Sequence, residues 1–445
     1  MFLTVHPGNP LTGEVELPGD KSLSHRAVLF AALAEGESRV ENFLVSGVTR
    51  VMLDALAAMG VEWRLEGSLL RVQGRGLHGL RAPQQPLNCG NSATTLRMLA
   101  GLVAAAGIAA VLDGSEGLRK RPMERISEPL ARMGVEIESD EGRAPLRIKA
   151  RPAGQPLRAL DASLPVASAQ VKSCLLLAAL ASDGPGRLRE PGPSRDHTER
   201  MLSSMGLRIA NKGEQADGWY ETSIEPSGAA LRPLELRLPG DISSAAFLLV
   251  AGLITPGSAI RVRGVGLNPT RTGLVDVLQA MGGDLRVENL NDQAGEPAGD
   301  LVIRASRLRA AEVSGPLVVR MIDEFSAFGA AAAYADGCSQ VRDARELRYK
   351  ESDRISTLCH ELSALGVRTE EYEDGFRVWG GQPAGGSAAA HGDHRLAMAM
   401  TVAGLAARGA VQVAGAEMIN ESFPNFVEIL RGLGADLTMR AAGSA

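Results

Sequence analysis

Residues 17–36 of the chain read LPGDKSLSHRAVLFAALAEG. The second half of this stretch is apolar on every side, which is typical of a helix that is buried all round. The first half instead carries polar and charged side chains, namely Lys21, Ser22, Ser24, His25 and Arg26. The dipole of a helix already places positive charge at its N-terminus, so cations there need a negative partner. The stretch therefore predicts a buried helix whose first turn binds an anion.

Five further segments share this design, in which polar residues are followed by Ala, Leu and Val and then by a closing Gly: residues 91–107, 168–184, 241–257, 323–337 and 392–409. A second pattern is an amphipathic helical stripe that ends in Met-Gly or Leu-Gly before a strand-like run, with its glycines at Gly60, Gly134, Gly206, Gly282, Gly366 and Gly434. A glycine there suits the left-handed residue that closes many helices. The two patterns stay in phase. They predict six copies of one unit, which reads strand, buried helix, strand, amphipathic helix, strand, strand in about 75 residues.

Six such units are too many for one core, so we expect two domains of three units each. The sequence LPGDKS at Leu17 and LPGDISS at Leu238 look like the same start used twice. They predict a first domain at residues 20–237 and a second at residues 238–445 together with residues 1–19. The chain would then cross between the domains twice, and a ligand bound between them would close them.

Composition narrows the class of protein. The 445 residues are 45% apolar and 22% charged, as in soluble globular proteins, and the formal net charge of −5 gives no global attraction for nucleic acid. The longest uncharged apolar run, residues 98–112, is shorter than the roughly 20 residues that span a bilayer. Four scattered cysteines without a C-x-x-C motif favour reduced thiols. No signal peptide is recognisable, so we expect a cytoplasmic protein without membrane or nucleic-acid partners.

Charged residues gather at the starts of the other predicted helices. The first half supplies cations at Arg97, Arg121, Lys172 and Arg195, and Pro122 is a candidate helix start. The second half supplies further cations and two carboxylates: Lys350, Arg354, Arg395, Asp323 and Glu351. Helix capping accounts for Asp241 and Ser243. We expect Asp323 to cap the helix that follows it and also to serve as a candidate base. This division suits an enzyme with two anionic substrates and a proton to move.

Several familiar motifs are missing from the sequence. It has no P-loop and no nucleophile elbow, and GRGLHG is not a dinucleotide-binding fingerprint. His391 and His394 have no third ligand at a spacing that suits zinc. We therefore expect no zinc site, and the sequence does not support a redox or ATP-dependent enzyme.

At this point the motifs identify a family. Over nearly its full length the chain resembles the 5-enolpyruvylshikimate-3-phosphate synthases, through PGDKSLSHRA, GNSATTLR, LRKRPM, SAQVKS, SRDHTERML, IDEFSAF, RYKESDR, GDHRLAM and SFPNF. The resemblance implies an α/β (α+β) fold of two similar domains, each an inverted α/β barrel of three βαβαββ repeats around buried helices. It also implies a reaction in which phosphoenolpyruvate and shikimate 3-phosphate give the enolpyruvyl ether and phosphate, on the route to chorismate and aromatic amino acids, without a metal or an organic cofactor. We expect a monomer of two domains.

The resemblance also implies site residues, matched motif by motif. Ser22 and Arg26 are expected to hold the shikimate carboxylate. The rest of shikimate 3-phosphate is expected to contact Ser168, Ala169, Gln170, Arg195 and Lys350. Phosphoenolpyruvate is expected to contact Lys21, Ala93, Thr94, Arg121, Arg354 and Arg395. Asp323 is expected to take the proton of the attacking hydroxyl, and Glu351, assisted by Lys21, to manage the proton at the methylene carbon.

Two positions depart from many family members. Ala93 stands where many have Gly, and an added methyl there crowds ligands larger than phosphoenolpyruvate, so the chain resembles the glyphosate-tolerant class II and weak inhibition by glyphosate is expected. Glu421 stands where some members have Lys before S/T-F-P, so that contact is not assigned.

Three alternatives stay open. The first is the sister enolpyruvyl transferase that acts on UDP-N-acetylglucosamine, whose members typically carry a reactive Cys in the loop that here reads SEGLRKRPM. The second is RNA 3′-phosphate cyclase, which the acidic net charge disfavours. The third is a non-catalytic binder of phosphorylated metabolites, against which the presence of both Asp323 and Glu351 argues.

Overall fold

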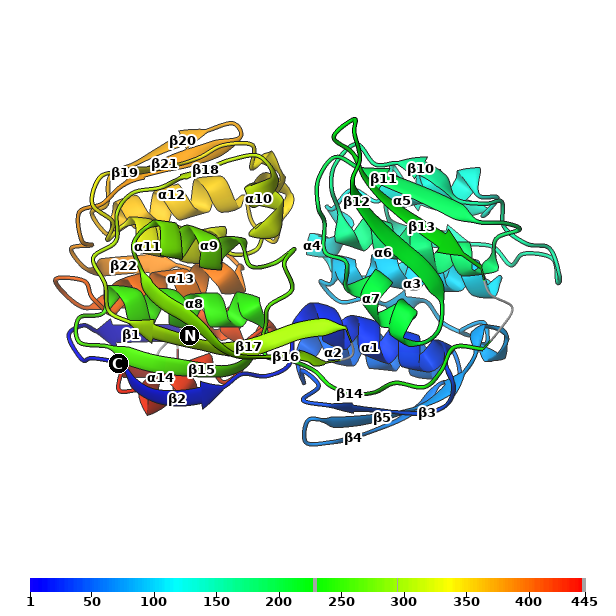
Figure 1. The fold of residues 1–445 in the computed structure, drawn as a ribbon, viewed down its shortest axis with the longest axis horizontal. Helices are drawn as coiled ribbons and strands as arrows, with labels where there is room; N and C mark the ends of the chain where they lie inside the picture. The colour runs from blue at the N-terminus through cyan, green and yellow to red at the C-terminus, as the bar shows by residue number, and fades with distance from the viewer. Residues whose placement is uncertain (227–229, 294, 442–445) are drawn as a thin grey trace. The chain divides into compact units, whose positions relative to one another are not determined.

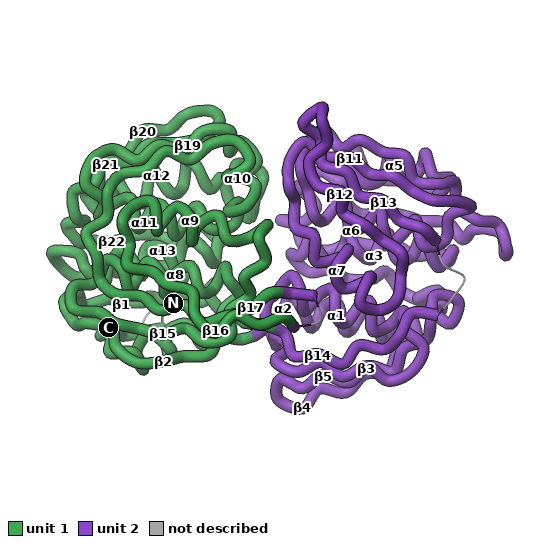
Figure 2. Tube along the Cα trace, viewed as in Figure 1, with its two compact units in different colours: residues 1–18, 239–292, 297–445 green, residues 19–238, 293–296 purple. Residues whose placement is uncertain are grey.

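The computed structural model describes residues 1–226, 230–293 and 295–441. The chain forms two compact units, coloured separately in Figure 2. Unit 1 comprises Met1–Pro18, Pro239–Asp292 and Pro297–Ala445, and unit 2 comprises Gly19–Leu238 and Gln293–Glu296. The sequence pattern did not predict that Gln293–Glu296 belong to unit 2. Within unit 2, Nδ1 of His197 lies 2.7 Å from a carboxylate oxygen of Glu296, and Arg200 donates to the carbonyl of Gly295 at 2.7 Å.

Three buried helices form the centre of unit 2: α1 (Lys21–Leu33), α3 (Ala93–Ala106) and α6 (Ala169–Ala178) (Figure 1). Each begins directly after a capping residue, respectively Asp20, Ser92 and Ser168, whose side chain accepts from a first-turn N–H. Their small residues allow close packing. A Cβ added to Gly101 of α3 would lie 2.2 Å from the carbonyl oxygen of Cys174 in α6, so these two backbones touch only because position 101 is glycine.

Three four-stranded sheets surround these helices, in the orders β14-β3-β5-β4, β6-β7-β9-β8 and β10-β11-β13-β12. Their strands are β3 (Glu35–Glu41), β4 (Glu62–Glu66), β5 (Leu69–Arg75), β6 (Leu87–Asn88), β7 (Ala110–Asp113), β8 (Ile137–Asp140), β9 (Arg143–Ile148), β10 (Asp161–Ser163), β11 (Gly186–Glu190), β12 (Arg208–Glu214), β13 (Tyr220–Glu225) and β14 (Glu235–Arg237). The amphipathic helices are α2 (Gly47–Ala58), α5 (Glu124–Arg132) and α7 (His197–Ser204), with the short helices α4 (Glu116–Arg119), η1 (Leu77–Gly79) and η2 (Ala179–Ala181) between elements.

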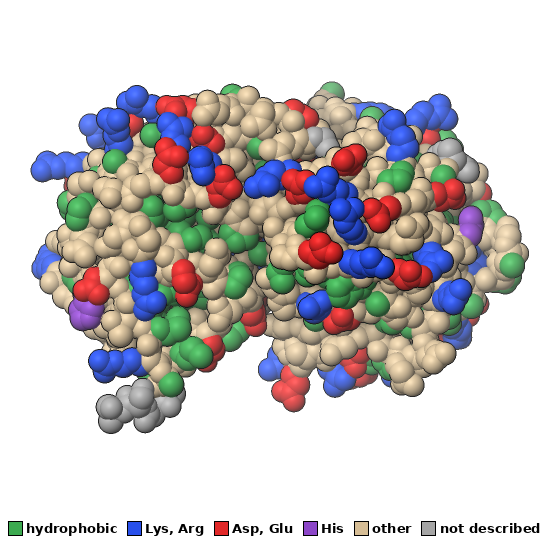
Figure 3. Space-filling view, turned by 90° about the horizontal axis from the view of Figure 1, so that it is seen from below, with side chains coloured by type: hydrophobic (Ala, Val, Ile, Leu, Met, Phe, Trp, Pro, Cys, Tyr) green, Lys and Arg blue, Asp and Glu red, His purple; other side chains and the backbone are tan. Residues whose placement is uncertain are grey.

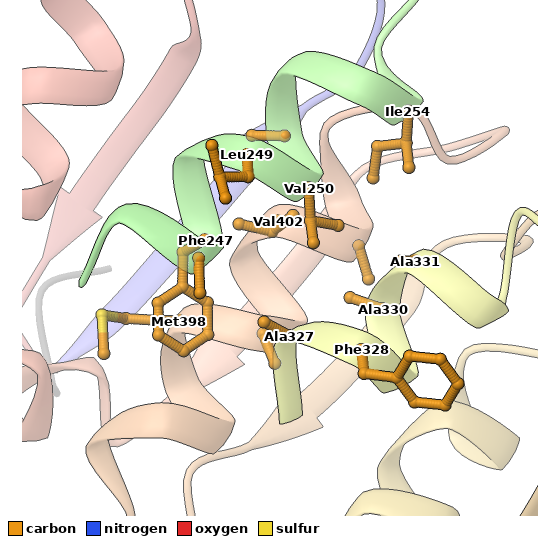
Figure 4. Packing of buried hydrophobic residues seen from close by; sticks show 14 of the residues in the cluster. Phe247, Leu249, Val250, Ile254, Ala327, Phe328, Ala330, Ala331, Met398 and Val402 are labelled. Carbon is orange, nitrogen blue, oxygen red and sulfur yellow. The ribbon is translucent and has the colours of Figure 1, made fainter. Parts of the chain in front are cut away.

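Unit 1 repeats this plan around α8 (Ile242–Ile254), α11 (Phe325–Ala332) and α13 (His394–Gly404). Figure 4 shows Phe247 and Val250 of α8 facing Met398 and Val402 of α13, with Ala327 of α11 beside them. All five side chains are buried. The centre of unit 1 is therefore a dry contact of three helices, made close by alanine.

The sheets of unit 1 have the orders β16-β17-β15-β2, β18-β19-β21-β20 and β22-β23-β1-β24. Their strands are β1 (Phe2–His6), β2 (Thr12–Glu16), β15 (Ala259–Gly266), β16 (Asp284–Gln293), β17 (Glu296–Arg304), β18 (Glu312–Val313), β19 (Cys338–Val341), β20 (Thr369–Tyr372), β21 (Gly375–Trp379), β22 (Gly386–Ala389), β23 (Val411–Ala414) and β24 (Asp436–Arg440). The outer helices are α9 (Gly273–Ala280), α12 (Arg354–Ala364) and α14 (Phe426–Gly432), joined by α10 (Pro316–Arg320), η3 (Arg345–Tyr349) and η4 (Ala416–Glu421).

The expected repeat of strand, buried helix, strand, amphipathic helix, strand, strand is confirmed, except that three strands join the sheet of a repeat that is distant in sequence. β2 precedes α1 in sequence but pairs in parallel with β15, which follows α8. β14 precedes α8 but pairs in parallel with β3, which follows α1. The N-terminal strand β1 pairs with β23 and β24 and so completes the sheet of the last repeat. Each sheet thereby reaches four strands, although no single stretch of sequence supplies all the strands of these three sheets.

Glycines close the outer helices as expected. The glycine after each amphipathic helix has a positive φ, between 84° and 115°, at Gly60, Gly134, Gly206, Gly282, Gly366 and Gly434. The expectation that the buried helices also run up to their closing glycine is wrong for five of them. Gly107 does cap α3, but α1 ends at Leu33 and α8 at Ile254, each three residues before its glycine, because the chain leaves the helix early to enter the next strand.

Two local expectations also need correction. The stretch SEGLRKRPM, described above as a loop, contains the short helix α4 (Glu116–Arg119). Pro122 does not start a helix, because α5 begins at Glu124.

On the face drawn in Figure 3, Lys and Arg side chains are interspersed with Asp and Glu, so the described residues on that face form no extended surface of one sign. Among the described residues, no helix is long and apolar enough to cross a bilayer.

Candidate functional site

One carboxylate and three cations meet in unit 1. Asp323 lies between α10 and α11, with one carboxylate oxygen 3.7 Å from Nζ of Lys350 and 3.5 Å from a guanidinium nitrogen of Arg354. Its other oxygen lies 3.8 Å from Arg395, which also donates to the backbone carbonyl of Asp323 at 2.9 Å. The five residues predicted for this half of the chain are thus brought together, because Glu351 lies 2.7 Å from the same Arg354.

Helix starts position these side chains. Arg354 is the first residue of α12, which Asp353 caps, and Arg395 is the second residue of α13, which Asp393 caps. Asp323 was expected to cap α11, and this expectation is wrong. The residue at the cap position is Glu324, and α11 has no side-chain cap. The Asp323 carboxylate lies beside the three cations.

Asp393 lies in the motif GDHRLAM but was not predicted to have a role. Asp393 is fully buried and accepts from Nε of Arg354 at 2.7 Å. Burial acts to lower the pKa of Arg354, but the charges of Asp393 and Glu351 outweigh burial and hold that pKa above its ordinary value. Burial likewise acts to raise the pKa of Asp393, and Arg354 outweighs it, so that this pKa lies below its ordinary value. Arg354 is therefore held rigid and charged.

The start of α1 organises a second group, in unit 2. Arg195 donates to the Ser22 hydroxyl at 3.2 Å. Arg26, only 2% exposed, donates to the carbonyl of Ser22, to Ser173 and to Thr198. Burial lowers the pKa of Arg26 to about 10, so the side chain is charged at neutral pH. Lys21 is the half-buried first residue of α1.

A third group lies at the starts of α3 and α6 in the same unit. The Gln170 amide donates to the Thr94 hydroxyl at 2.8 Å and accepts from Arg97 at 2.6 Å. Arg97 also donates to the carbonyl of Pro122, beside Arg121. Ala93 and Ala169 are the first residues of α3 and α6, and Ser168 caps α6. Arg97 was noted in the sequence as a cation but given no role, and the structure makes it the link between two predicted site segments.

Lys172 does not join these cations, which corrects the expectation that it opens α6 as an anion-binding residue. It is fully buried, and its Nζ lies 2.7 Å from Glu190 and 2.8 Å from Glu199. Sequence spacing could not distinguish a lysine that faces a ligand from one that faces the core. Glu421, which stands where some family members have Lys, has a carboxylate oxygen 3.8 Å from His394.

The remaining candidate metal ligands and thiols are accounted for by protein contacts or burial. His391 lies 2.6 Å from Glu361, and no cluster of three or more His, Cys, Asp or Glu side chains that could hold a metal occurs among residues 1–226, 230–293 and 295–441. Burial raises the pKa of Cys89, Cys174 and Cys359 to about 12, so these thiols are protonated at neutral pH.

Six βαβαββ repeats around buried helices, with cation groups at the helix starts, define the enolpyruvyl transferase class of fold. The chain has a TM-score of 0.79 with the enolpyruvyl transferase NikO from Streptomyces tendae at 23% identity, covering 98% of both chains, a likeness of fold. It has a TM-score of 0.87 with an EPSP synthase structure from Acinetobacter baumannii at 38% identity, covering 98% of this chain and all of that one.

The sequence comparisons are more specific. Residues 5–430 match the family model of EPSP synthase (3-phosphoshikimate 1-carboxyvinyltransferase). A 3-phosphoshikimate 1-carboxyvinyltransferase from Citrifermentans bemidjiense is 47% identical, covering 97% of this chain and 98% of that protein. Another from Alkalilimnicola ehrlichii is 46% identical, covering 98% and 97% respectively. The chain therefore belongs to the EPSP synthase family.

Proposed function

We propose that the protein transfers the enolpyruvyl group of phosphoenolpyruvate to the 5-hydroxyl of shikimate 3-phosphate and releases phosphate, as a step towards chorismate. Near-complete matches to relatives of that name support the proposal. The single structural observation that carries it is Asp323, a carboxylate set among Lys350, Arg354 and Arg395. A base surrounded by fixed cations suits a reaction between two anions in which a proton leaves a hydroxyl.

In this proposal unit 2 supplies most of the contacts to shikimate 3-phosphate. Ser22 and Arg26 bind its carboxylate, and the bonds of Arg26 to Ser173 and Thr198 hold the guanidinium in place. The rest of the molecule is assigned to Ser168, Ala169, Gln170, Arg195 and Lys350. Charge-assisted bonds of this kind contribute about 1.5–3 kcal/mol each.

Phosphoenolpyruvate is assigned to the cations Lys21, Arg121, Arg354 and Arg395 and to the helix start at Ala93 and Thr94. The tetrahedral adduct and the departing phosphate are anionic. Fixed cations stabilise such charge without reorganising during the reaction, provided that they are held in place beforehand. The paired carboxylate of Asp393 does this for Arg354.

Proton transfer is assigned to two carboxylates. Asp323 accepts the proton of the attacking hydroxyl, while Glu351, with Lys21, delivers a proton to the methylene carbon and removes one when phosphate leaves. Lys350 and Arg354 place two positive charges within 4 Å of the Asp323 carboxylate. We also propose that the protein acts as a monomer in the cytoplasm, because one chain carries both residue sets and both substrates are small anionic metabolites.

The decisive assay is release of phosphate from phosphoenolpyruvate as a function of added shikimate 3-phosphate. Asp323→Asn and Glu351→Gln are each expected to lower kcat by about 100-fold or more, the usual contribution of a general acid or base. Glu370→Gln, which changes an exposed carboxylate on β20, is the matched control and should leave kcat unchanged. Rates of both variants within threefold of the parent would overturn the assigned roles.

The same assay separates the alternatives. Phosphate release that depends on UDP-N-acetylglucosamine instead of shikimate 3-phosphate would identify the sister transferase. Tight binding of both anions without any phosphate release, measured by calorimetry, would identify a non-catalytic binder.

A further inference from the structure

A buried lysine bonds to residues on both sides of one of the proposed substrate-binding arginines, Arg195. Lys172 of α6 is 0% exposed, and its ammonium group has three acceptors around it. These are a carboxylate oxygen of Glu190 at 2.7 Å, a carboxylate oxygen of Glu199 at 2.8 Å and the backbone carbonyl of Ser194 at 3.3 Å. An ammonium group has three N–H donors, so this set uses all of them.

The three acceptors come from three places in the chain. Glu190 ends β11, Ser194 lies in the loop that follows, and Glu199 lies in the first turn of α7. Ser194 makes two bonds in this group, because its carbonyl accepts from Lys172 and its hydroxyl donates to Glu190 at 2.9 Å. Lys172 therefore holds the loop between β11 and α7 on both sides of Arg195.

Arg195 is the residue that this arrangement orients. Its guanidinium donates to Ser22 at the start of α1, while the residue before it and a residue four positions after it bond to Lys172. We propose that Lys172 is a positioning residue, which acts through Arg195 to bind the 3-phosphate of shikimate 3-phosphate. This inference rests on the proposed function.

The energetics agree with a positioning role. One oxygen of Glu190 and one of Glu199 are buried without a hydrogen-bond donor among the described residues. The other oxygens also accept from the hydroxyls of Ser194 and Thr222, at 2.9 and 3.4 Å, but these donors are neutral, and Lys172 supplies the positive charge that balances the two carboxylates. Burial acts to lower the pKa of Lys172, but the two carboxylates outweigh it and keep the ammonium charged. Loss of the ammonium leaves two buried carboxylates facing each other, and the loop moves to relieve them.

The test compares two ligands that differ by one phosphate group. Lys172→Met removes the ammonium and keeps the length of the stem. The dissociation constants of shikimate 3-phosphate and of shikimate are measured by calorimetry, and kcat and both KM values by phosphate release. The expected result is a 10- to 100-fold weaker binding of shikimate 3-phosphate, the effect of displacing a binding group by about 1 Å. Binding of shikimate and the KM for phosphoenolpyruvate should stay within about threefold of the parent, since neither involves the 3-phosphate.

A double-mutant cycle separates positioning from a general structural role. If Lys172 acts through Arg195, adding Lys172→Met to Arg195→Ala changes binding by less than about twofold, because the shared contact is already lost. Lys149→Met, an exposed lysine of the same unit, is the control and should leave all constants unchanged. If the single variant does not fold, Lys172→Met combined with Glu190→Gln removes one charge of each sign and is measured in its place.

The inference is overturned if shikimate 3-phosphate binds the variant within twofold of the parent, if shikimate weakens equally, or if the two substitutions are additive. These outcomes are distinct from failure of the proposed function, which shows in the parent enzyme as absence of phosphate release with shikimate 3-phosphate.

Discussion

Arg354 and Asp393 form a buried ion pair in which Nε of the guanidinium lies 2.7 Å from the carboxylate. The two residues begin and cap different helices, α12 and α13, and are 39 positions apart. The pair fixes the direction of a guanidinium that also contacts Asp323 and Glu351. The buried carboxylate of Asp393 thus positions Arg354, the cation that pairs with both proposed catalytic carboxylates.

Replacement of Asp393 is expected to cost stability and substrate affinity together. Asp393→Asn removes the negative charge of the carboxylate that pairs with the buried Arg354. Breaking a buried ion pair lowers the free energy of unfolding by about 3 kcal/mol or more. The free energy of unfolding in urea and the KM for phosphoenolpyruvate measure the two effects. Glu373→Gln, which breaks an exposed pair with Arg345, should cost less than about 1 kcal/mol. Equal losses in the two variants would contradict the role of burial.

Ala93 is predicted to set the response to glyphosate. It is the first residue of α3 and is 1% exposed, so its methyl group takes up space at a helix start assigned to phosphoenolpyruvate. Ala93→Gly is expected to strengthen glyphosate inhibition by about tenfold, equivalent to relief of ~1.4 kcal/mol of overpacking. Ala106→Gly, at the other end of α3, controls for the loss of helix propensity. An unchanged inhibition constant in Ala93→Gly would contradict the steric explanation.

His25 is predicted to make stability depend on pH in the mildly acidic range. Burial, with the charges of Lys21 and Arg26, lowers its pKa from 6.5 to about 4. The unfolded chain therefore binds a proton at this position between pH 6.5 and 4 while the folded chain does not, so stability falls as pH falls through this window. By linkage the loss is about 3 kcal/mol for a shift of this size.

This effect is measured by urea unfolding of the parent and of His25→Gln from pH 7 to pH 4. The variant should lose less stability over this range than the parent. His360→Gln, whose side chain is 73% exposed, should follow the parent. Parallel curves for the parent and His25→Gln would show that the imidazole does not titrate differently in the folded state.

The close approach of α3 and α6 gives a test of the fold itself. Gly101→Ala places a methyl group 2.2 Å from the carbonyl oxygen of Cys174, a backbone atom with no freedom to move aside. We expect a loss of about 3 kcal/mol or a failure to fold. Gly432→Ala in α14 meets nothing within 4 Å and should be neutral or stabilising by up to about 1 kcal/mol. Thermal unfolding of the two variants side by side decides the matter.

Much of the architecture follows from local sequence signals. A wholly apolar helix must be buried, and a glycine after an amphipathic stripe must end it, so the six repeats are readable without a structure. Asp241 illustrates this, because its predicted role as the cap of α8 is confirmed by its bond to the N–H of Ser243. The same prediction is wrong for Ser243, which is the second residue of α8 and whose hydroxyl donates to Glu324. The motifs around Asp323 and Arg395 were also recognisable, since each is a short run of adjacent residues.

Other features depended on long-range contacts. Whether Lys172 faces a ligand or two buried glutamates is decided by residues 18 and 27 positions away. The partner of Arg354 is a residue of a different helix, and β1 completes a sheet whose other strands lie some 400 residues later. A sequence by itself determined the repeats, because helix burial and capping act over a few residues. Only the tertiary structure decided the charge pairing and the exchange of strands, because burial and Coulomb energies depend on distances in space that no local pattern encodes.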